Sequence, residues 1–204
     1  MNGPGWACWD LATNKSTEVF SIHYSNMEDM PTVVMLAGLP GTGKTTLAYE
    51  LGRIFGWMVL DKDILNADLL NAGLQQAQAG PLAYEMMFSL ARDLVIRQRH
   101  SVIMDTAGRQ PRIEEEATRI AKEAPAHLRI IRLVASPPVR KKRMTSRIPG
   151  PSQWITDDTT NEEEVQWYAH LPAHTFVVST EGELEEVVGN VLAFLRGRTT
   201  AAQM

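Results

Sequence analysis

Cysteine is nearly absent from the 204-residue sequence, which contains only Cys8. A single cysteine excludes an intrachain disulfide and fits a reducing cytosol. Long apolar runs are also missing, since residues 33–38 fall far short of the length that a membrane span requires. Residues 1–4 lack the basic and apolar regions of a secretory signal. We therefore expect a cytoplasmic protein without a membrane partner.

An excess of positive charge is lacking as well, because 20 Lys and Arg residues face 24 Asp and Glu residues and leave a net charge of −4. Such a chain has no overall basic field that would draw it onto nucleic acid or an anionic membrane, although a local basic groove is compatible with this balance. With 44% hydrophobic residues, the chain can bury one core and suits a single domain.

From about residue 32, short apolar segments alternate with longer segments of helical periodicity. We predict strands at residues 32–37, 57–60, 101–105, 129–134 and 174–178. We predict helices at residues 44–55, 81–99, 111–123, 138–147 and 183–195. The strands are short and almost continuously apolar, as expected for strands that are covered on both faces. This alternation is typical of an α/β fold built from βαβ units on a parallel sheet.

The ends of the chain stand outside this alternation. Residues 1–30 are predicted to be an extension, either a hairpin around residues 13–16 or a disordered leader. The main domain is expected to span residues 31–198, followed by a tail at residues 199–204. Nothing in the pattern predicts the oligomeric state.

A glycine-rich loop follows the first predicted strand and carries the strongest functional signal. Its residues are Gly38, Leu39, Pro40, Gly41, Thr42, Gly43, Lys44, Thr45 and Thr46. In this type of loop, backbone N–H groups and a helix N-terminus gather phosphate oxygens. Lys44 is expected to reach the β- and γ-phosphates of ATP, and the Thr45 hydroxyl is expected to ligate Mg²⁺. The loop therefore predicts ATP and Mg²⁺ as cofactors.

Two acidic segments end later strands, where α/β sheets bind ligands. Asp61 and Asp63 follow the second predicted strand, so that Asp63 could accept a proton from an attacking hydroxyl, while Asp61 could orient that hydroxyl or position the water of the metal. Alternatively, either acid simply caps the next helix. Asp105 ends the third predicted strand and is expected to hold Mg²⁺ through water, although it could instead begin a turn. We assign Asp61, Asp63 and Arg109 to the acceptor side.

A basic helix is predicted after the fourth strand. It contains Arg143 and Arg147, which are four residues apart and would share one helical face. Two guanidinium groups closing over the γ-phosphate would stabilise the charge that is transferred. The alternatives are a solvated basic face or a patch that binds nucleic acid.

In this order, residues 32–196 resemble the P-loop kinases of the predicted-kinase group, which includes polynucleotide 5′-hydroxyl kinase, zeta toxin, gluconate kinase and chloramphenicol phosphotransferase. The resemblance rests on the glycine-rich loop and on residues 61–63, 102–105 and 143–147. It implies a three-layer fold with a five-stranded parallel sheet in the order 2-3-1-4-5 and a helical lid over about residues 137–160. It also implies that Asp63 is the general base and that Arg143 and Arg147 are lid arginines.

One residue departs from this family pattern. Several relatives carry an arginine three residues after the base, where this chain has Asn66, and this weakens a polynucleotide assignment more than a kinase assignment. The expected acceptor is a hydroxyl-bearing small molecule, such as a sugar, nucleoside or antibiotic, or a nucleic-acid 5′ end.

Two other classes of nucleotide-binding protein share some of these sequence features. A GTPase switch is favoured by residues 105–108, but no guanine-reading Asn-Lys-x-Asp follows them, and Arg109 stands where a water-positioning glutamine is expected. A remodelling ATPase usually needs a second helical domain, for which we expect no room after the last strand.

Overall fold

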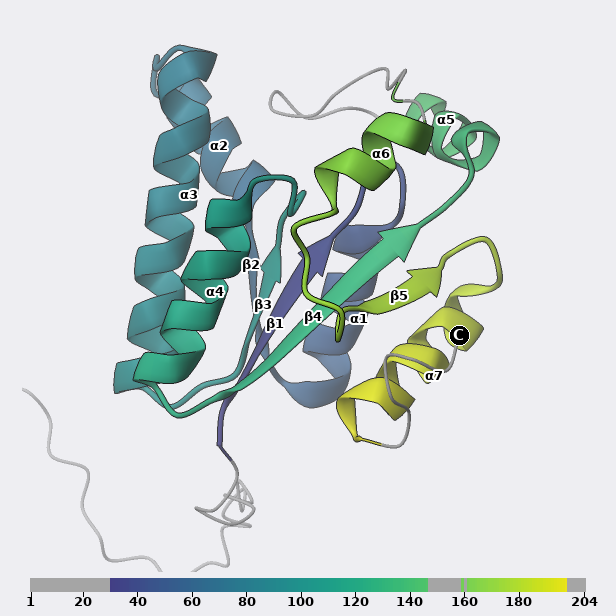
Figure 1. Ribbon diagram of the computed structural model, residues 1–204. Helices are drawn as coiled ribbons and strands as arrows, with labels where there is room; N and C mark the ends of the chain where they lie inside the picture. The colour runs from purple at the N-terminus through teal and green to yellow at the C-terminus, as the bar shows by residue number, and fades with distance from the viewer. Residues whose placement is uncertain (1–29, 147–158, 160, 198–204) are drawn as a thin grey trace, which may run out of the picture.

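Five parallel strands form one sheet in the order β2-β3-β1-β4-β5, within the residues that the computed structural model describes, namely 30–146, 159 and 161–197 (Figure 1). The strands are β1 (Thr32–Ala37), β2 (Met58–Asp61), β3 (Val102–Asp105), β4 (His127–Val134) and β5 (Phe176–Ser179). This order confirms the one that the family resemblance implies.

Helices cover both faces of the sheet (Figure 1). They are α1 (Lys44–Phe55), α2 (Lys62–Asn71), α3 (Gln76–Arg92), α4 (Pro111–Glu123), α5 (Pro137–Thr145), α6 (Asn161–Trp167) and α7 (Leu184–Leu195), and a π-helical turn, η1 (Asp93–Arg97), extends α3. α3 and α4 pack on one face, whereas α1 and α7 pack on the other. The three layers agree with the predicted α/β fold.

The central strand β1 shows why both faces need a helical layer. Val33 and Met35 join the core beneath α3 and α4, whereas Val34 and Leu36 join the core beneath α1 and α7. All four side chains are completely buried. Because successive side chains of a strand point to opposite faces, an uninterrupted apolar strand can only be covered from both sides.

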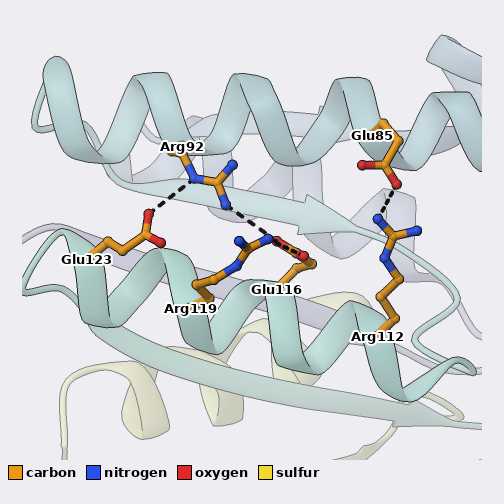
Figure 2. A network of polar contacts seen from close by, with 6 residues as sticks. All are labelled: Glu85, Arg92, Arg112, Glu116, Arg119 and Glu123. Carbon is orange, nitrogen blue, oxygen red and sulfur yellow. Dashed lines mark hydrogen bonds and ion pairs between the residues drawn. The ribbon is translucent and has the colours of Figure 1, made fainter.

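A network of ion pairs joins α3 to α4 on the outside of the molecule (Figure 2). Arg92 of α3 donates to Glu123 at 3.2 Å and to Glu116 at 3.4 Å, and Glu116 also accepts from Arg119. Nearer the carboxyl end of the sheet, Arg112 of α4 pairs with Glu85 of α3. These pairs fix the two helices that flank one side of the candidate site.

Some element boundaries differ from those predicted. α3 begins at Gln76 and contains Pro81, whereas Pro81 was expected to begin the helix. Residues 76–79 supply a helical turn because Gln and Ala have good helical propensity, so the proline falls inside the helix. α5 ends at Thr145, and Arg147 lies outside the described residues. The predictions for residues 1–29, the remainder of the lid and the tail also lie outside them.

Candidate active site

The candidate site lies at the carboxyl ends of β1, β2 and β3. Parallel pairing places Asp105 of β3 beside Leu36 of β1 and beside Asp61 of β2. The glycine-rich loop leaves β1 at the same edge and leads into α1. Strand register therefore brings the loop and the acidic segments together, as the sequence predicts.

The loop presents the start of α1 to a cavity. Gly43 has a left-handed conformation at the N-cap, and no side chain of the described residues caps the helix there. The first helical hydrogen bond of the loop runs from the Leu47 N–H to the Gly43 carbonyl at 3.0 Å. The N–H groups of the preceding turn lack intrahelical acceptors, as in any α-helix, and are suited to bind an anion.

Side chains within the loop hold its shape. The Leu39 carbonyl accepts hydrogen bonds from Thr42 Oγ1 at 2.8 Å and from Lys44 Nζ at 3.0 Å. Gly41 has a φ of 80°, and an added Cβ would lie 2.8 Å from the Arg140 carbonyl oxygen. A side chain at this position would therefore push the loop away from α5.

Thr45 and Asp105 form a pair of oxygen donors beside the loop. Thr45 Oγ1 donates to Asp105 Oδ2 at 2.6 Å. Burial raises the pKa of Asp105 to about 6, against the opposing effects of Lys44 and of the Thr45 hydrogen bond. The described residues contain no group of three or more His, Cys, Asp or Glu side chains that could hold a metal. The pair fits Mg²⁺, which commonly takes one or two protein oxygens and completes its shell with water and phosphate.

The two acids after β2 have different surroundings. Asp61 Oδ1 accepts the Asp63 N–H at 2.8 Å and caps α2, and burial raises the pKa of Asp61. The Asp63 side chain is 42% exposed, and its Oδ1 lies 3.1 Å from Lys62 Nζ. Asp61 therefore caps the next helix, which is the alternative role that the sequence left open. It also lines the cavity together with Asp63.

The arginines of α5 face the loop rather than the solvent. Arg140 is 2% exposed. Arg143 donates from Nη1 to Thr180 Oγ1 at 3.0 Å and to the Gly41 carbonyl at 3.4 Å, and from Nη2 to the Thr180 carbonyl. The Thr180 hydroxyl in turn donates to the Thr42 carbonyl at 2.9 Å. Arg143 thus contacts the loop and the residue that follows β5, its predicted role over the γ-phosphate stays a prediction, and Arg147 lies outside the described residues.

These groups surround a cavity of about 1060 Å³. Among the loop residues, Pro40, Gly41, Gly43, Lys44, Thr45 and Thr46 line it, whereas Gly38, Leu39 and Thr42 are not among the described lining residues. One end is formed by α5 and by the segment from β5 into α7, and the other end by α2, α3, the start of α4 and the end of α6. The two groups of elements lie on opposite sides of β1.

The structure adds lining residues that sequence reasoning missed, among them Arg112, Trp167 and Thr180. Thr180 directly follows β5, so its place at a strand end could have signalled it. Arg112 and Trp167 lie on helices, and no local pattern marks them as facing a cavity.

One backbone oxygen joins the loop to α6. The Ala107 carbonyl accepts the Gly38 N–H at 3.1 Å and the Tyr168 hydroxyl at 3.0 Å. Beside it, the Arg109 guanidinium stacks on the Trp167 ring, with 4.2 Å between Cζ and the ring centroid. Arg109, assigned to the acceptor side from the sequence, therefore lies with α6 at the cavity wall.

This fold and this loop define a P-loop nucleotide-binding protein, and its fold resembles that of P-loop kinases. Residues 33–164 match the model of the AAA_33 family, described as an AAA domain, and the chain belongs to that family. The resemblance to P-loop kinases is confirmed. No helix in the described part of the chain is long and apolar enough to cross a membrane.

Solved structures of similar fold include kinases. A candidate kinase of Chloroflexus aurantiacus is 22% identical, with a TM-score of 0.63, covering 84% of this chain and all of that one (100%). A gluconokinase of Sinorhizobium meliloti is 19% identical, with a TM-score of 0.55 and coverages of 83% and 94%. APS kinase CysC of Mycobacterium tuberculosis, in complex with AMPPNP and APS, is 16% identical, with a TM-score of 0.55 and coverages of 82% and 99%. At these identities, the likeness concerns the fold.

A curated relative is a larger protein. The chain is 27% identical over 132 residues to Rv2004c of Mycobacterium tuberculosis, which covers 59% of this chain and 26% of that protein. The chain thus spans about a quarter of the length of the curated relative.

Proposed function

We propose that this protein is a kinase that transfers the γ-phosphate of Mg-ATP to a hydroxyl group of an acceptor. The observation that carries the proposal is one cavity with a phosphate-binding loop and the Thr45–Asp105 pair on its floor and the Asp63 carboxylate beside them. A nucleotide-binding fold alone would not require an acid in the position of Asp63. The kinases among the structures of similar fold support the same class.

The residues divide into three tasks. Lys44 and the loop N–H groups bind the β- and γ-phosphates, while Thr45 and Asp105 are the residues that would hold Mg²⁺, which would neutralise phosphate charge there. Asp63 accepts the proton of the acceptor hydroxyl as its oxygen forms a bond to the γ-phosphorus and the bond from that phosphorus to the ADP oxygen breaks. Arg143, and Arg147 by family resemblance, close over the γ-phosphate.

A GTPase switch fits the site less well than a kinase. The Thr106 hydroxyl donates to the Leu36 carbonyl at 2.8 Å, and Thr106 is 2% exposed. The Ala107 carbonyl is bonded to the loop and to α6. Residues 105–108 are therefore held against the sheet, whereas a switch segment must change its contacts when γ-phosphate is lost.

Two substitutions test the division of tasks. Lys44→Ala should abolish both ATP binding and phosphate transfer, because it removes the ammonium group that meets the phosphates. Asp63→Asn should abolish transfer but leave Mg-ATP affinity within about twofold, because the acid acts on the acceptor. Calorimetry with Mg-AMPPNP and transfer of labelled γ-phosphate measure the two effects. Loss of ATP binding in Asp63→Asn would show that the acid is structural.

The assay needs controls for other nucleotide-binding classes. Tight retention of GDP and preference for GTP would indicate a switch. Hydrolysis of ATP that no acceptor redirects would indicate a non-kinase ATPase. Acceptors to be screened are sugars, nucleosides, antibiotics and 5′-hydroxyl oligonucleotides, and magnesium dependence is measured by chelation with EDTA.

A further inference from the structure

Helix α3 forms an uncharged wall of the cavity. Its lining residues recur every three or four positions and share one face of the helix. They are Gln76, Ala77, Gly80, Pro81, Tyr84 and Phe88. The charged side chains of α3, Glu85 and Arg92, lie outside this face and pair with α4 (Figure 2). The α3 wall thus offers mainly apolar surface to a bound compound.

This wall lies next to the proposed general base. Lys62 Nζ lies 5.5 Å from the centroid of the Tyr84 ring and also contacts Asp63 Oδ1 at 3.1 Å. Burial and, to a smaller extent, the charge of Asp63 raise the pKa of Tyr84 to about 12. A hydroxyl that faces Asp63 therefore brings the rest of its molecule close to the Tyr84 ring.

Two neighbouring elements extend the apolar surface. Ile113 of α4 and Trp167 of α6 also line the cavity. Ile113 and Phe88 belong to the core beneath α3 and α4, and Tyr84 and Trp167 pack against that core. The apolar lining is therefore an extension of the hydrophobic core. An apolar group that binds there is removed from water, which favours its binding.

The charges at this end of the cavity are paired within the protein. Lys62 pairs with Asp63, and Arg112 pairs with Glu85 of α3 (Figure 2). Asp61 lines the same end, so that acids and cations lie together there. A charged acceptor would compete with these pairs, whereas an uncharged acceptor leaves them intact.

Gly80 widens the cavity in the middle of the α3 wall. It lies inside the helix, where glycine is a poorer helix former than alanine. Its φ is not positive, and an added Cβ would approach a single atom of the described residues, Gln76 Nε2, at an ordinary distance of 3.6 Å. Neither the backbone nor the packing of the described residues therefore requires glycine at this position.

We infer that the acceptor is an uncharged hydroxy compound with an aromatic ring, and that this ring lies on the α3 wall at Gly80 while the hydroxyl faces Asp63. The inference rests on the proposed function and specifies its substrate class. An aromatic ring buries a flat apolar face against Tyr84 and loses little conformational freedom on binding. Gly80 is then a specificity-determining residue, because a side chain there would occupy the place of the ring.

The first experiment measures binding of the ring without knowledge of the true acceptor. The probe is 2-naphthalenemethanol, a fluorescent alcohol, and it is titrated into protein saturated with Mg-AMPPNP so that the nucleotide end is filled. Fluorescence anisotropy measures its binding. We expect saturable binding that Gly80→Leu weakens about tenfold or more. Gly80→Ala, which adds only a methyl group, should weaken it by a smaller factor.

Gly189→Leu is the matched control. Gly189 also lies inside a helix, α7, and an added Cβ would meet no atom of the described residues within 4 Å. It is not among the described lining residues, so this variant should bind the probe as the wild type does. Because alanine and leucine are good helix formers, neither Gly80 variant should have a lower Tm than the wild type. Absent saturation, equal weakening by Gly80→Leu and Gly189→Leu, or no weakening by either Gly80 variant overturns the inference.

The second experiment compares matched acceptors in phosphate transfer. The pairs are phenyl glucoside with methyl glucoside, adenosine with methyl riboside, and benzyl alcohol with ethanol. In at least one pair, the aromatic member should have a kcat/KM about tenfold higher or more, mainly through KM, and Gly80→Leu should reduce this preference. Equal use or rejection of both members in every pair overturns the inference, and so does a higher kcat/KM for gluconate than for every aromatic compound.

The two proposals fail in different ways. If Mg-AMPPNP does not bind the wild-type protein, the proposed kinase function falls. If Mg-AMPPNP binds and acceptors without an aromatic ring are phosphorylated as well as those with one, the kinase function stands and only the aromatic acceptor is wrong.

Discussion

The position of Asp105 in the site lowers the stability of the folded protein, because its carboxyl group is buried. Its ordinary pKa is 3.8, and burial raises this pKa to about 6 in the folded protein. Between these values the folded state keeps a proton that the unfolded state has lost. The contribution of Asp105 to stability is therefore fully present below about pH 4 and is lost as the pH rises through about 6.

Asp105→Asn should consequently stabilise the protein at pH 8 in the absence of metal and nucleotide. The expected gain in the free energy of unfolding is about 1–3 kcal/mol, since one pKa unit corresponds to about 1.4 kcal/mol. The gain should vanish near pH 4. Urea unfolding at both pH values measures it. A variant that is less stable than wild type at pH 8 would show that the Thr45 hydrogen bond outweighs the burial of charge.

Thr180, in contrast, stabilises the folded protein, because its hydroxyl forms hydrogen bonds with several buried groups. It donates to the Thr42 carbonyl and accepts from Arg143, and Thr180 is 6% exposed. Thr180→Val should lower the free energy of unfolding by about 1–3 kcal/mol and raise the KM for ATP, since both partners lose a hydrogen bond beside the loop. Thr180→Ser, which keeps the hydroxyl, should restore the KM. Equal KM values in the two variants would contradict a positioning role.

The sequence predicts residues of the site where they are neighbours in a motif or end a strand. Lys44, Thr45 and Asp105 were found in this way, and the structure brings them together. Thr180 was not, because only its place after β5 marks it in the sequence and its contact with Thr42 spans 138 residues. The roles of Asp61 and Asp63 stayed open in the sequence, since a cap and a base both place an acid after a strand.

At the scale of elements, the turn after β3 is fitted closely to β1. Gly108 has a φ of 64°, and an added Cβ would lie 2.5 Å from the Ala37 Cβ. The segment that carries Arg109 therefore leaves the sheet along a path that only glycine permits.

Gly108→Ala should lower the free energy of unfolding by about 3 kcal/mol or more, because it combines backbone strain with a steric clash. Gly73→Ala is the matched control, since Gly73 has a φ of 94° but an added Cβ would meet no atom of the described residues within 4 Å. It should cost about 1 kcal/mol from strain alone. Chemical denaturation of both variants measures the difference. Similar losses would mean that β1 yields to the added methyl group.

Element boundaries were less predictable than element types. Every predicted strand is present, although β4 begins at His127 rather than at residue 129. Pairing with β1 explains the extension, since His127 lies opposite Thr32 in the register. α3 also begins earlier than predicted, at Gln76 rather than at Pro81, because proline is common in the first helical turn and Pro81 was therefore taken as the start.

At the scale of the molecule, nucleotide binding should stabilise the whole fold, because the loop connects β1 to α1 in the centre of the sheet. At a Mg-AMPPNP concentration about 100 times Kd, the expected stabilisation is about 2.7 kcal/mol. For a chain of this size, this corresponds to a rise in Tm of about 5–10 °C. Scanning calorimetry measures the shift, and Lys44→Ala should abolish it. A shift retained in that variant would place the nucleotide elsewhere.

The alternation of strands and helices predicts a parallel sheet but not the order of its strands. Several orders satisfy the same pattern, and the order 2-3-1-4-5 came from the family resemblance alone. The residues that line the cavity were equally hard to predict from the sequence, because they come from helices on both sides of β1.

The Ala107 carbonyl accepts two hydrogen bonds, and this has a consequence for how the protein could evolve. Almost any substitution keeps the main-chain oxygen of the substituted residue. A substitution at residue 107 therefore leaves both hydrogen bonds in place. Only the Tyr168 hydroxyl is exchangeable, because the other donor is the Gly38 amide. Selection for a new acceptor can thus release α6 through Tyr168 while the path of the phosphate loop is preserved.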